Sequence, residues 1–361
     1  MFKIYIKYII RKFLNKFIYI SLIFMSLIFI LNLFEEISFF KNINTNFLTP
    51  YFLTFLNSPI TLFELFPFIF LLSVQVFFNE IFIKNELTLF KNVGLSNLKI
   101  ITTLFLFSIF LGFIIIIFYY NLSSKFKFYY TDIKNNYSND NKYLAVVNDS
   151  GLWLKDETEE GIAIVKSSNI EDNYLNNVII NQFDFNFNLI KTIQSNKVDI
   201  SNKNWVIYKP TITKQNITSN EKLVINLKSN FDKNKINSLF SNFSTLDLRE
   251  LFFLKTDYEK LGYSSNEIMI HLLKILSSPF LYGLMTLLAS IIMFNTNRIN
   301  SLFFSMVLGI LVSVLVYYIN FMFVSLGNTG KIPNNLSIFL PIFFLFIINK
   351  FICDNFKFPI L

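Results

Sequence analysis

The chain has 361 residues, of which 53% are hydrophobic and 18% aromatic, and its formal net charge is +8. Only 16% of the residues are charged, against about a quarter in soluble domains, so the composition excludes an ordinary soluble protein and favours a membrane protein. A single cysteine, Cys353, and a single histidine, His271, exclude an intrachain disulfide and any metal site made of clustered cysteines or histidines.

Six stretches are long and apolar enough to cross a bilayer, whose hydrocarbon core of ~30 Å needs about 20 helical residues. The first follows basic residues, as in a signal peptide, but its length and the lack of a small-residue cleavage site favour a retained anchor. We expect transmembrane helices in residues 1–120, a polar domain in 121–270 and transmembrane helices in 271–361. The six windows are 14–34, 62–83, 100–120, 272–294, 301–325 and 334–352.

The basic residues indicate how the helices are oriented. Positive charge gathers on the cytoplasmic side of membrane proteins, which places the N-terminus in the cytoplasm. Six spans then put both termini and the loop 84–99 inside and the polar domain outside. That domain carries as many basic as acidic residues, so the net charge belongs to the membrane part and indicates topology, not nucleic-acid binding. The basic residues before the first span are Lys3, Lys7, Arg11, Lys12 and Lys16.

Short strand-like segments recur in the polar domain, with Asn, Asp, Ser and Gly between them. This spacing predicts an all-β sandwich or jelly-roll-like sheet. FDFNFN at 183–188 alternates apolar and polar residues, as a half-covered strand does, and we expect Trp153 and Trp205 in the core. Helical spacing within 244–268 predicts a short helix leading back to the membrane. The strand-like segments include KYLAVV, GLWLKD, GIAIV, NNVIINQ, LIKTIQ, NWVIY and KLVINL.

Convergent catalytic residues are not found in the sequence. His271 falls at the mouth of a membrane span and Cys353 near the cytoplasmic tail, which excludes a Ser-His-Asp set and a Cys-His pair. GNTGK at 327–331 has two residues between its glycines, where a phosphate-binding loop has four, so it predicts a turn between helices. The acidic pairs Glu35–Glu36 and Glu159–Glu160 fall in predicted loops, where solvation explains them.

The loop KNELTLFKNVGLSNLK, residues 84–99, separates two apolar windows. Leu87, Phe90 and Gly94 recur at helical spacing on one face, while Lys91 lies on another. Gly94 and the following Leu-Ser-Asn predict a helix stop and a new N-cap. We expect a short helix along the membrane surface, with Glu86 and the lysines free to meet a partner. The alternative is an interfacial hairpin whose lysines contact anionic lipid headgroups.

The motifs NELTLFKNVGLS, GLWLKD, VIINQFDFNFNLIKTIQ with NWVIYKP, KILSSPFLYGLM and GKIPNNLSIFLPIFF occur in this order along the chain. In the order of these motifs and of its predicted helices and strands, nearly the whole chain resembles the LptF/LptG permeases of lipopolysaccharide export. FEEISFF and NSPITLFELFPFIFLL are more similar to LptG than to LptF.

The resemblance implies an α-helical inner-membrane protein with six transmembrane helices, three on each side of an inserted periplasmic jelly roll. Such a permease pairs with a second permease and binds a dimer of the ATPase LptB, which holds the ATP and magnesium, so this chain needs no cofactor and is not an enzyme. It extracts lipopolysaccharide and passes it to a bridge of LptC and LptA. The coupling helix at about 84–95 contacts the ATPase, and its matching residues here are Glu86, Leu87, Phe90, Lys91 and Gly94.

Lipopolysaccharide carries phosphates, so basic residues are expected at the outer rim of its cavity. Lys274 is the most suggestive, because a charge within a span is costly unless it is paired or reaches the interface. Two other functions stay open: a mechanotransmitter that moves no lipid, and a membrane scaffold without an ATPase. Charge reversal at Glu86 should be silent in a scaffold. The rim residues predicted by topology are Lys41, Lys125, Lys127, Lys274 and Lys331.

Overall fold

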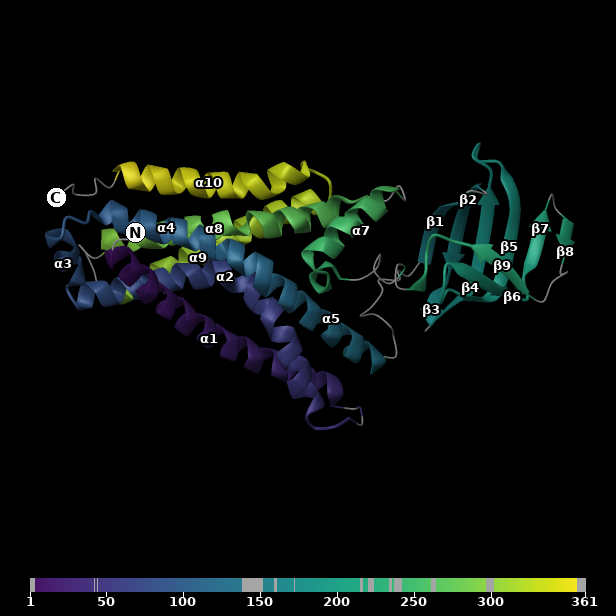
Figure 1. Cartoon of the computed structure of the whole chain (residues 1–361), viewed down its shortest axis with the longest axis horizontal. Helices are drawn as coiled ribbons and strands as arrows, with labels where there is room; N and C mark the ends of the chain where they lie inside the picture. Colours follow the sequence, from purple (N-terminus) through teal and green to yellow (C-terminus); the bar gives the residue numbers. More distant parts are fainter. Residues whose placement is uncertain are drawn as a thin grey trace. The chain divides into compact units, whose positions relative to one another are not determined.

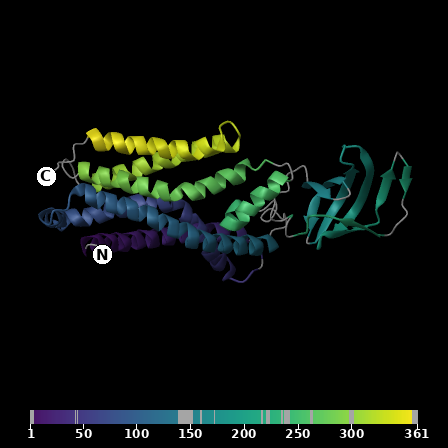
Figure 2. The same cartoon turned by 45° about the horizontal axis from the view of Figure 1, so that its top comes forward.

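The structure is a computed structural model that divides into a helical unit and a sheet unit (Figures 1 and 2). The helical unit comprises Met1–Tyr130, Ser244–Leu251 and Asn266–Leu361, and the sheet unit comprises Thr131–Phe243 and Phe252–Ser265. The residues described are 4–41, 43, 45–137, 152–158, 161–171, 173–214, 217–219, 224–233, 236, 242–260, 264–296 and 302–355. Glu159, Glu160 and the predicted strand KYLAVV lie outside them.

Within the described ranges, six helices are long and apolar enough to cross a membrane, which confirms the predicted three-plus-three arrangement. The first has 37 residues, about 55 Å at 1.5 Å per residue, and so exceeds the ~30 Å hydrocarbon core. The six begin and end as follows: α1 Ile4–Phe40, α2 Thr49–Ile83, α4 Asn97–Ile114 with its continuation, α8 Asn266–Thr296, α9 Leu302–Asn328 and α10 Asn334–Asn355.

The core of the helical unit lies around α2. Aromatic and branched side chains of α1 repeat every three or four residues and therefore form one face, which packs on α2. The Phe17 ring lies 4.8 Å from the Phe70 ring, and the Phe70 ring stacks on Tyr282 of α8 at the same distance. The α1 residues of this face are Ile9, Phe13, Phe17 and Ile20, all buried.

The third apolar helix continues beyond residue 120, where we expected the polar domain to begin. It passes through a π-helical segment, Ile115–Tyr120, into α5, Asn121–Asn136. The Tyr120 hydroxyl donates to the Leu246 carbonyl at 3.2 Å, and the Leu248 amide donates to the Asn121 side chain at 3.3 Å. These bonds hold the chain segment that returns from the sheet unit against the helical unit.

The predicted returning helix is confirmed as α7, Leu248–Lys260. Its start is a capping box, since the Asp247 carboxylate accepts from the Glu250 amide while the Glu250 carboxylate accepts from the Asp247 amide. The predicted turn at 327–331 is also confirmed: Gly330 has φ +70° and its amide donates to the Gly327 carbonyl at 2.8 Å.

The sheet unit confirms the predicted all-β insertion. Its strands are antiparallel, in the order β1-β2-β4-β5-β6-β9, with β3 beside β4 and the β7–β8 hairpin beside β5 (Figure 1). The strands are β1 Leu152–Thr158, β2 Gly161–Ser167, β3 Asn169–Glu171, β4 Tyr174–Phe183, β5 Leu189–Asp199, β6 Asn204–Tyr208, β7 Thr211–Lys214, β8 Ile217–Ser219 and β9 Val224–Lys228.

Two expectations for this unit are wrong. Phe183 ends β4, and the rest of FDFNFN, residues 184–188, is the turn to β5, because the Asp184 carboxylate accepts from the Asn186 and Asn188 amides and bends the chain. A hydrogen bond from the Asn188 side chain lowers the pKa of that carboxyl. Trp205 is fully buried as predicted, but Trp153 is 48% exposed, with the Lys166 ammonium 4.9 Å from its ring.

Candidate functional site

A short helix, α3 (Glu86–Asn92), joins α2 to α4 and lies at the end of the helical unit where α1 begins and α10 ends (Figures 1 and 2). Its end is a Schellman motif: the Leu95 amide donates to the Phe90 carbonyl and the Gly94 amide to the Lys91 carbonyl, both at 2.9 Å. Gly94 has φ +80°, a conformation that favours glycine. The Ser96 hydroxyl then accepts from the Lys99 amide at the start of α4. The predicted stop and N-cap are confirmed.

The two faces of α3 differ as the helical spacing predicts. Leu87 and Phe90 are partly buried and pack against the apolar core of the helical unit. Thr88, Leu89 and Lys91 are exposed on the other side. The short helix is therefore anchored to the bundle by apolar contacts and keeps an open surface.

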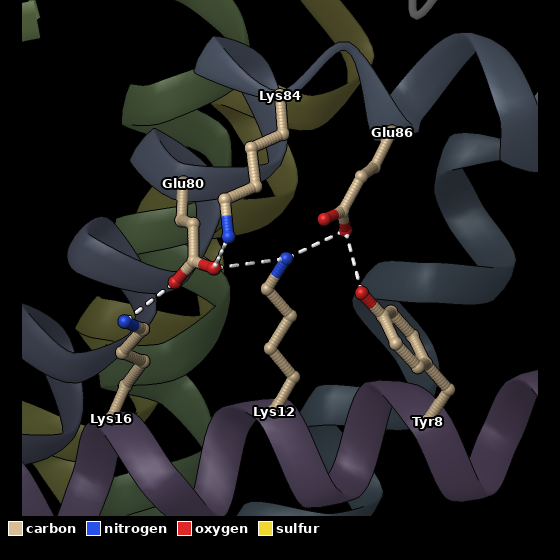
Figure 3. A network of polar contacts seen from close by, with 6 residues as sticks. All are labelled: Tyr8, Lys12, Lys16, Glu80, Lys84 and Glu86. Atoms are coloured by element: carbon tan, nitrogen blue, oxygen red, sulfur yellow. Dashed lines mark hydrogen bonds and ion pairs between the residues drawn. The ribbon is translucent and has the colours of Figure 1, made fainter.

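Glu86 is not free, as we expected it to be, because α1 supplies two partners for it (Figure 3). The Lys12 ammonium lies 2.6 Å from Oε2 of Glu86, and the Tyr8 hydroxyl donates to the same oxygen at 3.1 Å. The Tyr8 ring also meets the Phe90 ring edge-on, with 6.1 Å between centroids. The first turns of α1 therefore hold α3 through both a charge and an aromatic contact.

Glu80, near the end of α2, is the second carboxylate of this site. Its oxygens lie 2.5 Å from the Lys16 ammonium, 2.7 Å from that of Lys84 and 3.4 Å from that of Lys12. Lys12 thus lies between two carboxylates. We call the six residues the α1–α3 charge network: Tyr8, Lys12, Lys16, Glu80, Lys84 and Glu86 (Figure 3).

The central pair of this network is shielded from solvent. The side chain of Lys12 is 10% exposed and that of Glu86 is 15% exposed, while Lys84 at the edge is mostly exposed. Solvent screening makes exposed ion pairs contribute little to stability. That screening is weaker for a pair that is shielded from solvent. Three lysines face two glutamates, so the network is net positive before any partner binds.

Sequence reasoning missed the partners of Glu86. Tyr8, Lys12 and Lys16 are spaced one helical turn apart and therefore share one face of α1. We attributed these lysines to membrane topology alone. The 8–12–16 spacing was a signal for a polar face near the start of α1, but nothing local indicated which carboxylate it would meet.

The five lysines predicted for the outer rim have different surroundings. Lys41, Lys125, Lys274 and Lys331 have exposed side chains. Lys127 instead donates to the Asn57 side chain at 2.7 Å, and its ammonium lies 4.3 Å from the centre of the Tyr130 ring. The five lysines therefore stay candidate rim residues, and Lys127 differs from the other four in being engaged by neighbouring side chains.

Glu36 differs from the solvated loop residue that we expected. It lies in the last turns of α1 and is 1% exposed. The Tyr130 hydroxyl of α5 donates to Oε1 of Glu36 at 2.8 Å. A buried carboxylate is stable when it accepts hydrogen bonds, so this contact fixes the end of α1 against α5.

Two comparisons with known proteins bear on this geometry. Residues 7–353 match the family model described as lipopolysaccharide export system permease LptF/LptG. No curated protein matches the sequence.

Proposed function

Because the chain belongs to the LptF/LptG family of lipopolysaccharide export permeases, we propose that it is the membrane subunit of an ATP-driven ABC transporter. In this proposal the chain extracts lipopolysaccharide from the bacterial inner membrane and delivers it to a periplasmic bridge of LptC and LptA. A dimer of LptB-type ATPase supplies the energy, and a second LptF/LptG-type permease completes the membrane part.

The observation that carries the proposal is that α3 protrudes from the helical unit and is anchored in it. An ATPase that pushes on a membrane protein needs a rigid element that protrudes from the bundle yet is anchored in it. Leu87 and Phe90 anchor α3 by packing on the core, and Gly94 ends the helix sharply. The exposed side with Lys91 faces outward for a partner. A rigid-body movement of the partner is then passed to the helices on either side of α3.

The charges support a cytoplasmic position for α3. Lys84, Lys91 and Lys99 lie in or beside the α2–α4 connection, and Lys7 and Arg11 lie near the start of α1 at the same end of the helical unit. Positive residues mark the cytoplasmic side of a membrane protein. The sheet unit is then periplasmic, since an odd number of spans precedes it.

On the lipid side, the exposed lysines are the proposed contacts to the phosphates of lipopolysaccharide. Lys41 follows α1 directly and Lys331 lies in the turn between α9 and α10, at the opposite end of the helical unit from α3 (Figures 1 and 2). Lys125 and Lys274 are exposed on α5 and α8. Lys127 is the weakest candidate because its ammonium is already engaged by Asn57.

The test is charge reversal at Glu86 in the native membrane, followed by gentle solubilisation and identification of the ATPase that co-purifies. We expect Glu86→Lys to abolish ATPase recovery and lipopolysaccharide export. Glu267→Lys is the control for charge reversal itself, because Glu267 is likewise an acidic residue in the first turn of a helix, α8, although its side chain is exposed. Full ATPase recovery and export in Glu86→Lys would refute the proposed docking role.

A further inference from the structure

We propose that Lys12 is a positioning residue that links α3 to α1, so that a displacement of α3 is delivered directly to α1. The inference rests on the proposed function, in which α3 receives movement from an ATPase. It concerns how that movement continues into the membrane. The structural basis is the contact between Lys12 and Glu86 in the α1–α3 charge network (Figure 3).

The path of the chain gives α1 no direct connection to α3. α3 is joined directly to α2 and α4 by short connections, at residues 84–85 and 93–96. α1 is joined to α2 at the opposite end of the helical unit, through residues 41–48 (Figure 1). At the α3 end, α1 therefore follows a movement of α3 through side-chain contacts, and the described ones that reach Glu86 come from Lys12 and Tyr8.

The charges single out Lys12 within the network. Glu80 is neutralised by Lys16 and Lys84 as well as by Lys12, so it keeps two cations when Lys12 is removed. Glu86 has one described ammonium partner, Lys12, and a weaker neutral donor, Tyr8. Charge-assisted hydrogen bonds are shorter and stronger than neutral ones, which agrees with 2.6 Å for Lys12 against 3.1 Å for Tyr8.

The geometry lets a partner and Lys12 bind Glu86 together. Both described bonds from α1 end on Oε2 of Glu86, and Oε1 accepts neither (Figure 3). A carboxylate has several lone-pair positions, so Oε1 is able to accept from a donor of the ATPase while Lys12 holds Oε2. Glu86 then forms a bridge from the partner to α1, and docking does not require the α1 contact to break.

α1 is a suitable receiver of this movement. One face packs on α2 through Phe13 and Phe17, whereas Leu22, Ile30 and Leu31 on other faces are exposed. At its far end α1 carries the buried Glu36 and is followed by the exposed Lys41. A rigid helix of this length carries a displacement from the α3 end to the end where the rim lysines lie.

The experiment compares Lys12→Met with Lys16→Met in the complete complex purified from native membranes. Both lysines lie on the same face of α1 and bind Glu80, but only Lys12 reaches Glu86 among the described contacts. ATPase recovery, ATP hydrolysis and lipopolysaccharide released to an acceptor protein are measured in each. We expect Lys12→Met to keep the ATPase but to lower the lipid released per ATP about tenfold, the factor expected for a hydrogen bond to a charged group. Lys16→Met should change that ratio less than about twofold, as a pair that duplicates other contacts does.

Three further variants separate the possible outcomes. Lys12→Arg keeps the charge and should restore the ratio, and Lys12→Gln serves if the methionine variant is not recovered from membranes. An unchanged ratio in Lys12→Met or Lys12→Gln overturns the inference and leaves the proposed function intact. Loss of the ATPase from these variants also overturns it, because Lys12 would then act in docking. Full ATPase recovery and coupling in Glu86→Gln would count against both the Lys12 link and the proposed docking through Glu86.

Discussion

Lys12 and Glu86 are separated by 74 positions in the sequence, yet the ammonium of one lies 2.6 Å from a carboxylate oxygen of the other. The contact forms because α1 and α2 pack along one another, which brings the start of α1 to the end of α2 where α3 begins. Both side chains are largely shielded by the surrounding helices. Lys12 is therefore less exposed than the neighbouring Lys84. The free energy of coupling between Lys12 and Glu86 is measurable.

A double-mutant cycle should detect this coupling. We expect Lys12→Met and Glu86→Gln each to lower the stability of the purified protein in detergent. The double variant should be more stable than the sum of the two changes predicts, by about 1.5–3 kcal/mol, because each single variant removes the nearest charged partner of a shielded residue. Denaturant unfolding followed by circular dichroism gives the four free energies. Strict additivity would mean that the two groups do not interact.

Replacing Gly94 with alanine should disturb α3 through the backbone. A Cβ at Gly94 meets no atom within 4 Å, so the effect comes from φ +80° and should be about 1–2 kcal/mol. Gly330 is a matched control, because it has φ +70°, equally open space and the same pair of Schellman hydrogen bonds at the end of α9. Both alanine variants should lower the melting temperature, but Gly94→Ala alone should reduce ATPase recovery. Equal recovery in both variants would show that the shape of the α3 terminus is unimportant for docking.

Gly309 of α9 should tolerate no side chain while Gln75 of α2 keeps its position. A Cβ at Gly309 would lie 2.0 Å from Nε2 of Gln75, which is fully buried and donates to the Ser305 carbonyl at 2.9 Å. Overpacking of this kind destabilises by about 1–3 kcal/mol. Gly309→Ala should therefore lower the melting temperature, and Gln75→Ala in the same chain should restore much of the loss. If the second change brings no recovery, α9 does not lie against Gln75 in this way.

The two tryptophans provide a test of the sheet unit. Trp205 is fully buried and its indole nitrogen donates to the Phe231 carbonyl at 2.7 Å, while Trp153 is half-exposed. Trp153→Phe leaves Trp205 as the single tryptophan, so we expect blue-shifted tryptophan emission that resists quenching by acrylamide. Trp205→Phe should give red-shifted, readily quenched emission. It should also cost about 1–3 kcal/mol, since a buried carbonyl loses its donor. Similar quenching of the two variants would contradict this assignment.

The helices were predictable because apolar length alone identifies a span, and the end of α3 was predictable because Gly94 and Ser96 act locally. Elements whose structure depends on contacts with residues distant in the sequence were not predictable. The alternation of FDFNFN fits a strand as well as a turn, and the side-chain bonds of Asp184 decide for the turn. Likewise, nothing near Trp153 in the sequence distinguishes it from Trp205.

The candidate site likewise has features that the sequence predicts and features that it does not. The apolar face of α3, with Leu87 and Phe90, follows from helical spacing. The pairing of Glu86 with α1 does not, because sequence spacing defines faces within one helix and not which faces meet. Glu36 was misplaced for a related reason: its burial depends on Tyr130 of α5, and α5 exists because the third apolar helix continues beyond the membrane window.

The contact between Tyr130 and Glu36 leads to the last prediction. Tyr130→Phe removes the donor at 2.8 Å from a carboxylate that is almost fully buried, and a hydrogen bond to a charged group is worth about 1.5–3 kcal/mol. Tyr129→Phe is the matched control, since it removes the same hydroxyl from the neighbouring residue, whose side chain is 57% exposed. We expect a lower melting temperature for Tyr130→Phe and no change for Tyr129→Phe. Because the two side chains share this hydrogen bond, Glu36→Gln should cost less stability in the Tyr130→Phe background than in the unchanged chain. If Glu36→Gln costs the same in both, the two side chains do not interact and Tyr130 does not hold the end of α1.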